Sequence, residues 1–143
     1  MSDDAFPGRL SLSPPLTEAL FAWFQRIVAA YCLLSGVLYW VRLIGFYDAP
    51  LWRFDLMPVH WQIAVAMLAV LLPFAAAGLW MLASWGPVIW FLCAATEVIM
   101  YAGFPDLFGR RWQVVALHAA VALLYAVFRL VLHGQKKRQA EQA

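Results

Sequence analysis

The sequence predicts an all-α membrane protein: a bundle of four transmembrane helices, arranged as two antiparallel hairpins and preceded by an amphipathic N-terminal stretch. Three observations predict this fold class. Of 143 residues, 65% are hydrophobic and only 13% are charged, whereas a soluble domain has about 45–50% apolar and about 25% charged residues. The apolar residues form blocks near the ~20 residues that cross a hydrocarbon core. These blocks are continuous, which favours helices over the alternating strands of a barrel.

Residues 1–25 are expected to form a cytoplasmic or interfacial segment. Pro14 and Pro15 are followed by the run LTEALFAWF. Its mixture of apolar, acidic and aromatic residues is typical of a helix that lies at the membrane surface.

Residues 26–133 contain four predicted spans, at about 27–46, 59–82, 88–104 and 112–132. Gly86 and Pro87 separate the second span from the third, because proline is tolerated in the first turn of a helix. Gly103 and Pro105 end the third span. Pro73 lies inside the second span, where the loss of a backbone hydrogen bond predicts a kink. Residues 134–143 form a basic tail.

The basic residues indicate how the chain is oriented. Six flank the side that holds both termini: Arg9, Arg26, Arg129, Lys136, Lys137 and Arg138. Four flank the other side: Arg42, Arg53, Arg110 and Arg111. The positive-inside rule therefore predicts cytoplasmic termini in a multi-pass protein of the bacterial inner (cell) membrane. A net charge of +2 without a soluble basic surface argues against a nucleic-acid partner. The basic tail suits the anionic head groups of the bilayer.

The two loops on the predicted outer side resemble each other. GFPDLFGRRW, Gly103–Trp112, repeats features of GFYDAPLWRF, Gly45–Phe54, at a fixed offset, and His60 then aligns with His118. A duplicated hairpin explains the match. Alternatively, both loops need Gly-Phe to end a helix and Asp to start the next. The charged residues of these outer loops are Asp48, Arg53, Asp55, Asp106, Arg110 and Arg111.

Glu97 is the most unusual residue within the spans. It lies near the centre of WGPVIWFLCAATEVIMYAGF, too deep for its short side chain to reach water. An unpaired carboxylate there is costly, so we expect it to be protonated, paired or beside a wet cavity. His118 is the predicted partner: Glu97 lies about 12 Å and His118 about 10.5 Å inward of the short loop that joins the third and fourth spans.

Two roles for the Glu97–His118 pair follow from this placement. As a structural element, an interhelical hydrogen bond would fix helix register, at about 0.6–2 kcal/mol. As a functional element, the pair would pass a proton through a coupled titration. Tyr101, one turn outward of Glu97, and Tyr125 and Arg129, on the His118 face of the fourth span, would extend the pair into a polar relay towards the cytoplasm.

The remaining polar residues suggest no chemistry. Arg26 and Arg42 are expected to reach the membrane interfaces by snorkelling. Cys32 and Cys93 lie inside spans and are read as small packing residues. No spacing of His and Cys indicates a metal or haem, no glycine-rich loop indicates a nucleotide, and no nucleophile has a neighbouring base. We therefore expect no catalytic residues, no metal and no cofactor.

Most of the eight tryptophans are expected at the membrane interfaces, near the ends of the spans. They are Trp23, Trp40, Trp52, Trp61, Trp85 and Trp112.

Four segments carry a resemblance to a known family: WVRLIGFYDAPLWRFDLMPVHWQ, GLWMLASWGPVIWF, TEVIMY and ALHAAVALLYAVFRLVLH. They resemble small uncharacterised inner-membrane proteins of alphaproteobacteria, over about residues 23–133. This resemblance implies a four-helix inner-membrane protein and brings no activity. More loosely, Arg26 and Gly36 in the first span are similar to the opening helix of DoxX-like proteins, a four-helix family with members linked to redox or quinone biology.

Two functions are consistent with the sequence. The first is an accessory or scaffolding subunit, without enzyme activity, that associates with another membrane protein or with itself through its lipid-facing surface. The second is a small transport or redox accessory protein in which Glu97 and His118 handle a proton or a quinone-like ligand. Glu97→Gln separates them, because glutamine keeps a hydrogen bond but cannot titrate.

Overall fold

The computed structural model describes residues 14–143, and these residues form helices and connecting turns without strands. The helices are α1 (Pro14–Ile44), η1 (Phe54–Leu56), α2 (Val59–Trp80), α3 (Gly86–Val98), η2 (Ile99–Gly103), α4 (Pro105–Phe108) and α5 (Trp112–Gln142). Within this described part, four segments are long and apolar enough to cross a membrane: Pro15–Ile44, Val59–Trp80, Gly86–Gly103 and Trp112–Gln142. The predicted fold class, an all-α four-helix membrane bundle, is confirmed.

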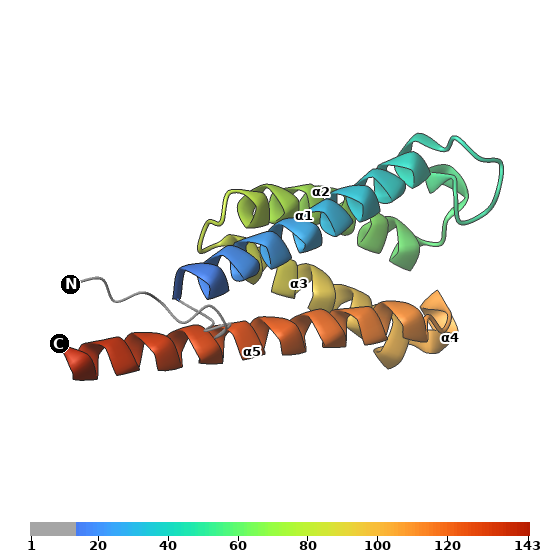
Figure 1. Cartoon of the computed structure of the whole chain (residues 1–143). Coiled ribbons are helices and arrows are strands. Elements are labelled where there is room, and N and C mark those ends of the chain that lie inside the picture. Colours follow the sequence, from blue (N-terminus) through green and yellow to red (C-terminus); the bar gives the residue numbers. More distant parts are fainter. Residues whose placement is uncertain (1–13) are drawn as a thin grey trace.

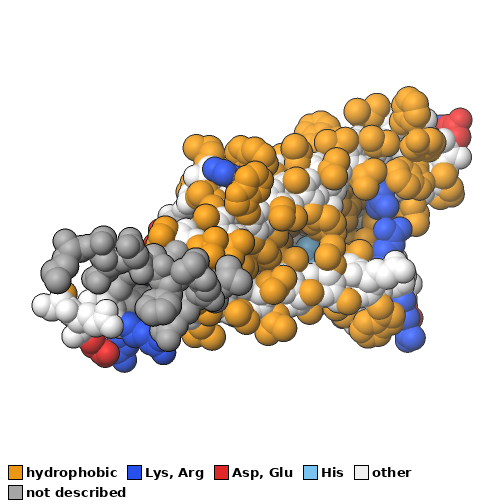
Figure 2. Space-filling model, viewed as in Figure 1, with side chains coloured by type: hydrophobic (Ala, Val, Ile, Leu, Met, Phe, Trp, Pro, Cys, Tyr) orange, Lys and Arg blue, Asp and Glu red, His pale blue; other side chains and the backbone are white. Residues whose placement is uncertain are grey.

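The long helices form two hairpins (Figure 1). α1 packs along α2, α2 packs against α3, and α5 lies against both α1 and α3. α1 begins, and α5 ends, at one end of the molecule, and the two inter-helix loops that contain η1 and α4 lie at the other. The visible surface in Figure 2 is mostly hydrophobic, with charged side chains gathered mainly near the two ends. This distribution fits a body that is surrounded by lipid.

Two helices extend further than the predicted spans. α1 runs unbroken from Pro14, because no glycine or proline interrupts it between Leu16 and Gly36. Residue 25 is therefore not a helix boundary, and residues 1–13 lie outside the described part. α5 continues through the basic tail to Gln142. Each helix has 31 residues, or about 46 Å, which exceeds a ~30 Å hydrocarbon core.

The extensions of α1 and α5 meet at the end of the molecule that holds the C-terminus. Gln135 Nε2 donates a hydrogen bond of 3.0 Å to Thr17 Oγ1. Phe21 lies 5.7 Å from Tyr125 and 5.6 Å from Phe128, measured between ring centroids. These contacts fasten the two helices together beyond the middle of the bundle.

Pro73 shapes the contact between α1 and α2. A proline at this position cannot donate a backbone hydrogen bond to the carbonyl of Ala69, one turn earlier. Trp40 of α1 supplies the missing donor, because its Nε1–H lies 2.9 Å from Ala69 O. Gly36 makes the approach possible: a Cβ on this residue would lie 3.0 Å from Pro73 Cδ.

The turn between α2 and α3 is equally tight. A Cβ on Gly78 would lie 2.5 Å from the Trp85 ring and 2.7 Å from Gly86 Cα, so glycine is required at the crossing. Leu82 takes a left-handed conformation with φ 56°. The Ala83 N–H then reaches back to Gly78 O at 2.9 Å, which caps the end of α2.

The core lies between α1, α2 and α3, and its most deeply buried side chains are Leu68, Leu72, Val65, Cys32 and Cys93. α5 stands apart from this core. Within α5, which the structure describes in full, His118 alone is buried. The partly covered residues of α5 continue from His118 at alternating spacings of three and four, as in a coiled-coil seam; they are Val121, Tyr125, Phe128, Leu132 and Gln135.

Candidate functional site

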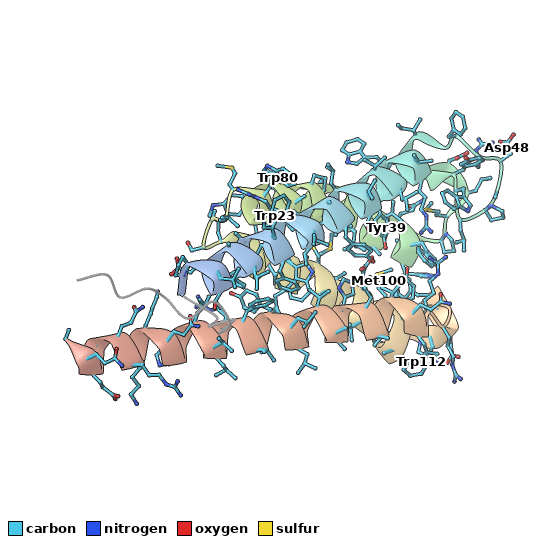
Figure 3. The ribbon with its side chains drawn as sticks, viewed as in Figure 1. Trp23, Tyr39, Asp48, Trp80, Met100 and Trp112 are labelled. Carbon is cyan, nitrogen blue, oxygen red and sulfur yellow. The ribbon has the colours of Figure 1, made fainter. Side chains whose placement is uncertain are left out.

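Glu97 sits where three helices converge. It is 5% exposed, and both of its carboxyl oxygens have partners. Tyr39 of α1 donates its hydroxyl to Oε1 at 2.8 Å, and His118 of α5 places Nε2 2.5 Å from Oε2. Figure 3 shows Tyr39 on the side of α1 that faces α5. The structure thus brings Glu97 and His118 together and adds a third member, Tyr39.

The backbone after Glu97 departs from the α-helix. Residues Ile99–Gly103 form a π-helical turn, in which the Phe104 N–H donates to Ile99 O at 3.1 Å. Such turns hold one extra residue and are frequent at functional sites. Here the consequence is that Met100 and Tyr101, which are adjacent in sequence, are both buried.

His118 is enclosed by aromatic rings. Its side chain is 3% exposed, and its ring centroid lies 6.1 Å from that of Trp90 and 6.4 Å from that of Tyr31. Nδ1 has no hydrogen-bond partner among the described residues. A proton on Nε2 is therefore directed at Glu97, whereas a second proton on Nδ1 would be a buried, unsatisfied donor.

A cavity of about 210 Å³ opens beside Glu97. Most of its lining is polar or aromatic, and the lining comes from α1, α3, η2 and α5. It consists of Tyr31, Ser35, Leu38, Tyr39, Arg42, Glu97, Tyr101, Arg111 and Val114. In Figure 2 a histidine is visible at the base of the hollow between α1 and α5, and basic side chains lie towards the end opposite the C-terminus.

The Arg42 side chain is enclosed by the protein, which the sequence did not suggest. It is 7% exposed, because the rings around it hold its guanidinium within the bundle. The guanidinium carbon lies 4.8 Å from the Trp52 ring centroid, 5.7 Å from that of Trp61 and 5.4 Å from that of Tyr39. Trp61 is itself only 3% exposed, so its ring faces the interior of the bundle as part of this cage.

The two outer loops meet, and their charged residues have different roles. Arg53 binds Asp55 at 2.8 Å and Asp48 at 3.1 Å. These hydrogen bonds and charges lower the pKa of Asp55 and raise that of Arg53. Arg111 instead lies over the Tyr101 ring, 5.7 Å from its centroid.

The other outer-loop residues lie on the surface around a contact between the two loops. Asp106 and Arg110 are exposed. His60 Nε2 lies 3.2 Å from Leu107 O, which holds the short α4 against the start of α2. The loops are therefore adjacent, as the hairpin topology predicts.

The predicted relay is divided in two. Tyr101 lines the cavity beside Glu97, but Tyr125 and Arg129 line a separate cavity of about 330 Å³ towards the other end of the bundle. The space between the two, against Trp90, is about 10 Å³, room for at most about one water molecule. Among the described residues, Tyr125 and Arg129 therefore do not line the cavity that holds Glu97 and Tyr101.

In the structure, residues that the alignment of the two loops pairs do not have the same surroundings. Tyr39 and Glu97, which bond to each other, are 58 positions apart, the same offset that aligns the two loops. The aligned residues themselves differ in environment: His118 is buried, whereas His60 is partly exposed in a loop contact. The two hairpins thus have similar loop sequences, but the aligned histidines do not form equivalent sites.

Sequence reasoning identified Glu97 and His118 and missed Tyr39 and Arg42. The available signal was their spacing, since Tyr39 and Arg42 are three residues apart and so share one face of α1. Among the described residues, no group of three His, Cys, Asp or Glu side chains could hold a metal ion.

Comparison with known proteins identifies the family alone. No curated protein matches the chain, and no solved structure matches it. A family of unknown function, DUF6163, matches residues 19–136, which include all four transmembrane segments except the ends of α1 and α5. The chain therefore belongs to this uncharacterised family, DUF6163.

Proposed function

We propose that the protein is a small transport or redox accessory protein of the bacterial inner membrane, with both termini in the cytoplasm, in which Tyr39, Glu97 and His118 take up and release a proton. The observation that carries this proposal is the position of Glu97. Its carboxyl group accepts from Tyr39 and pairs with His118 while also lining a cavity of about 210 Å³. A bond that serves only helix register needs no cavity beside it.

The chemistry of the cluster suits proton exchange. A proton shared between Glu97 and His118 has two arrangements, carboxyl with imidazole or carboxylate with imidazolium, and the Tyr39 hydroxyl favours the carboxylate. The unsatisfied Nδ1 position disfavours the imidazolium. These two effects act in opposite directions, and the proposal is that a change in the occupant of the cavity shifts the proton between the two groups.

The test is the response of the His118 ring to pH. Protein with ¹⁵N-labelled histidine, in lipid nanodiscs, is followed by NMR across the pH range in which the fold persists. We expect the ring nitrogens of His118 to report a change of protonation that is altered in Glu97→Gln. His60 and His133 serve as internal references. Ring nitrogens of His118 that stay constant over the whole range would leave the pair a structural bond and refute the proposal.

A second candidate is the accessory or scaffolding subunit, and the exposure of α5 favours it. α5 contacts the rest of the bundle along one seam, and Ala119, Ala122 and Ala126 lie exposed on another face. Small residues allow another transmembrane helix to approach closely. Affinity purification in mild detergent, followed by mass spectrometry, tests this candidate. A stoichiometric membrane partner that is lost when these alanines become leucines supports it, and recovery of the chain alone contradicts it.

A further inference from the structure

We propose that the cavity beside Glu97 binds a small organic monoanion whose anionic group lies on Arg42 and Arg111. This inference names the ligand class of the proposed function and so rests on that cavity being a ligand site. Its evidence is separate: it comes from the arginines and not from the proton-handling cluster.

The first step is that Arg42 is a buried cation without an anion. Its side chain lines the cavity and is 7% exposed. Among residues 14–143, no carboxylate lies within 4.0 Å of it, and its Nε is buried without a hydrogen-bond partner. A guanidinium has five N–H donors, and a buried ion is costly unless a counter-charge and hydrogen bonds compensate.

The second step is that the rings around Arg42 fix it without satisfying it. Trp52, Trp61 and Tyr39 provide cation–π contacts, and the π faces leave the edge of the guanidinium free. That edge carries the N–H groups that bind a carboxylate or phosphate in a bidentate manner. Such pre-organisation is typical of an oxyanion site.

The third step is the charge of the cavity. Arg42 and Arg111 contribute two positive charges, and Glu97 contributes at most one negative charge. The lining is therefore positive in either protonation state of Glu97, and a carboxylate at Glu97 beside a neutral His118 leaves an excess of one positive charge. A monoanion neutralises this excess.

The fourth step is the shape of the remaining lining. Leu38 and Val114 are apolar, and Tyr31 and Tyr101 add ring surface. At about 210 Å³ the cavity is smaller than the about 300–1,000 Å³ typical of drug-sized ligands. These features fit an oxyanion with a small apolar or aromatic body. A free carboxylate and the phosphodiester of a lipid with a net charge of −1 both offer this chemistry.

Arg26 provides a matched control within the chain. Like Arg42 it has cation–π contacts, at 5.9 Å from the Trp23 and Trp80 ring centroids, and an Nε without a hydrogen-bond partner among the described residues. Unlike Arg42, it does not line the cavity. Arg110 plays the same part for Arg111, since it is the adjacent arginine but is not part of the lining.

The experiment measures binding of benzoate to the full chain in phosphatidylcholine nanodiscs, by calorimetry and by tryptophan fluorescence. The fluorescence is informative because Trp52 and Trp61 contact Arg42, where the anion is expected to bind. Benzyl alcohol and benzamidine are the neutral and cationic analogues of the same size. Of the three compounds, we expect only benzoate to show saturable binding. Arg42→Gln and Arg111→Gln should weaken it about tenfold or more, as loss of a charge-assisted hydrogen bond implies, whereas Arg26→Gln and Arg110→Gln leave it unchanged.

A second lipid composition identifies the source of the anion. If phosphatidylglycerol in the nanodisc competes with benzoate, the monoanion site is a lipid head-group site; if it does not, the site serves a free anion. Should Arg42→Gln fail to fold, Arg42→Lys, which keeps the charge but loses the bidentate edge, is expected to weaken binding as well. No benzoate binding in either lipid, equal binding of benzyl alcohol, or equal losses in Arg26→Gln and Arg42→Gln would overturn the inference.

The two proposals fail separately. Loss of the pH response of His118 with benzoate binding intact refutes proton handling alone. Absence of benzoate binding with the pH response intact refutes the monoanion site alone.

Discussion

Replacement of Tyr39 by phenylalanine tests the bonding of the buried cluster most directly. Phenylalanine keeps the ring in its buried place, so little apolar surface changes, and only the hydroxyl that donates to Glu97 Oε1 at 2.8 Å is lost. Because His118 occupies the other oxygen, Oε1 is then left without a donor. Interhelical hydrogen bonds in membranes contribute about 0.6–2 kcal/mol, and bonds to charged groups about 1.5–3 kcal/mol.

We therefore expect Tyr39→Phe to lower the free energy of unfolding by about 1–2 kcal/mol. The assay is reversible unfolding from mixed micelles, followed by circular dichroism. Tyr47→Phe is the control, because Tyr47 is 54% exposed and contacts Phe46 and Trp52 through its ring. In a double-mutant cycle with Glu97→Gln, the two losses should be less than additive. Equal, near-zero effects of Tyr39→Phe and Tyr47→Phe would refute the assigned bond.

Three further variants test the fold, each by the same unfolding assay. Gly78→Ala should lower the free energy of unfolding by about 1–3 kcal/mol, because its methyl group enters the tight turn between α2 and α3. Gly134→Ala is the control: this residue lies in open space, and the substitution should raise the free energy of unfolding by about 0.5–1 kcal/mol. A Gly78→Ala variant as stable as the unmodified protein would contradict the described packing. Trp40→Phe should cost about 1–3 kcal/mol by leaving Ala69 O without a donor; no loss would mean that the carbonyl is satisfied otherwise. Because the pKa of Asp55 is lowered in the fold, its ion pair stabilises the fold above about pH 3.9, and this stabilisation is lost as the pH falls below that value. Asp55→Asn should remove this part of the loss of stability in acid. An unchanged dependence of stability on pH in Asp55→Asn would contradict the assigned ion pair.

The number of spans and the Glu97–His118 pair were predictable because both depend on depth alone. Span length follows from the rise per residue, and a short loop places two positions at equal depth on neighbouring helices. Rotation about the helix axis is a different matter. The hydroxyl of Tyr39 reaches Glu97 across two helices that are distant in sequence, and the sequence pattern does not specify which faces of those helices meet.

The environment of Arg42 was mispredicted for a related reason. A long basic side chain near a helix end can extend outwards to water or fold inwards onto aromatic rings. The choice depends on Trp52 and Trp61, which come from the next loop and helix. The π turn after Glu97 could not be predicted from the sequence either, because its residues have the pattern of an ordinary apolar helix. The length of α5 was obscured by the polar residues of QKKRQAEQ, although most of these are good helix formers.

The separation of Glu97 from His118 by 21 positions affects membrane insertion during synthesis of the protein. The segment Gly86–Gly103, formed by α3 and η2, is the least apolar of the four transmembrane segments, with a mean hydropathy of 1.4 against 1.9–2.3 for the others. It leaves the ribosome before the histidine partner of Glu97. A carboxylate in the middle of a helix opposes insertion. We therefore expect insertion of the Glu97-bearing segment to become more favourable once α5 supplies His118.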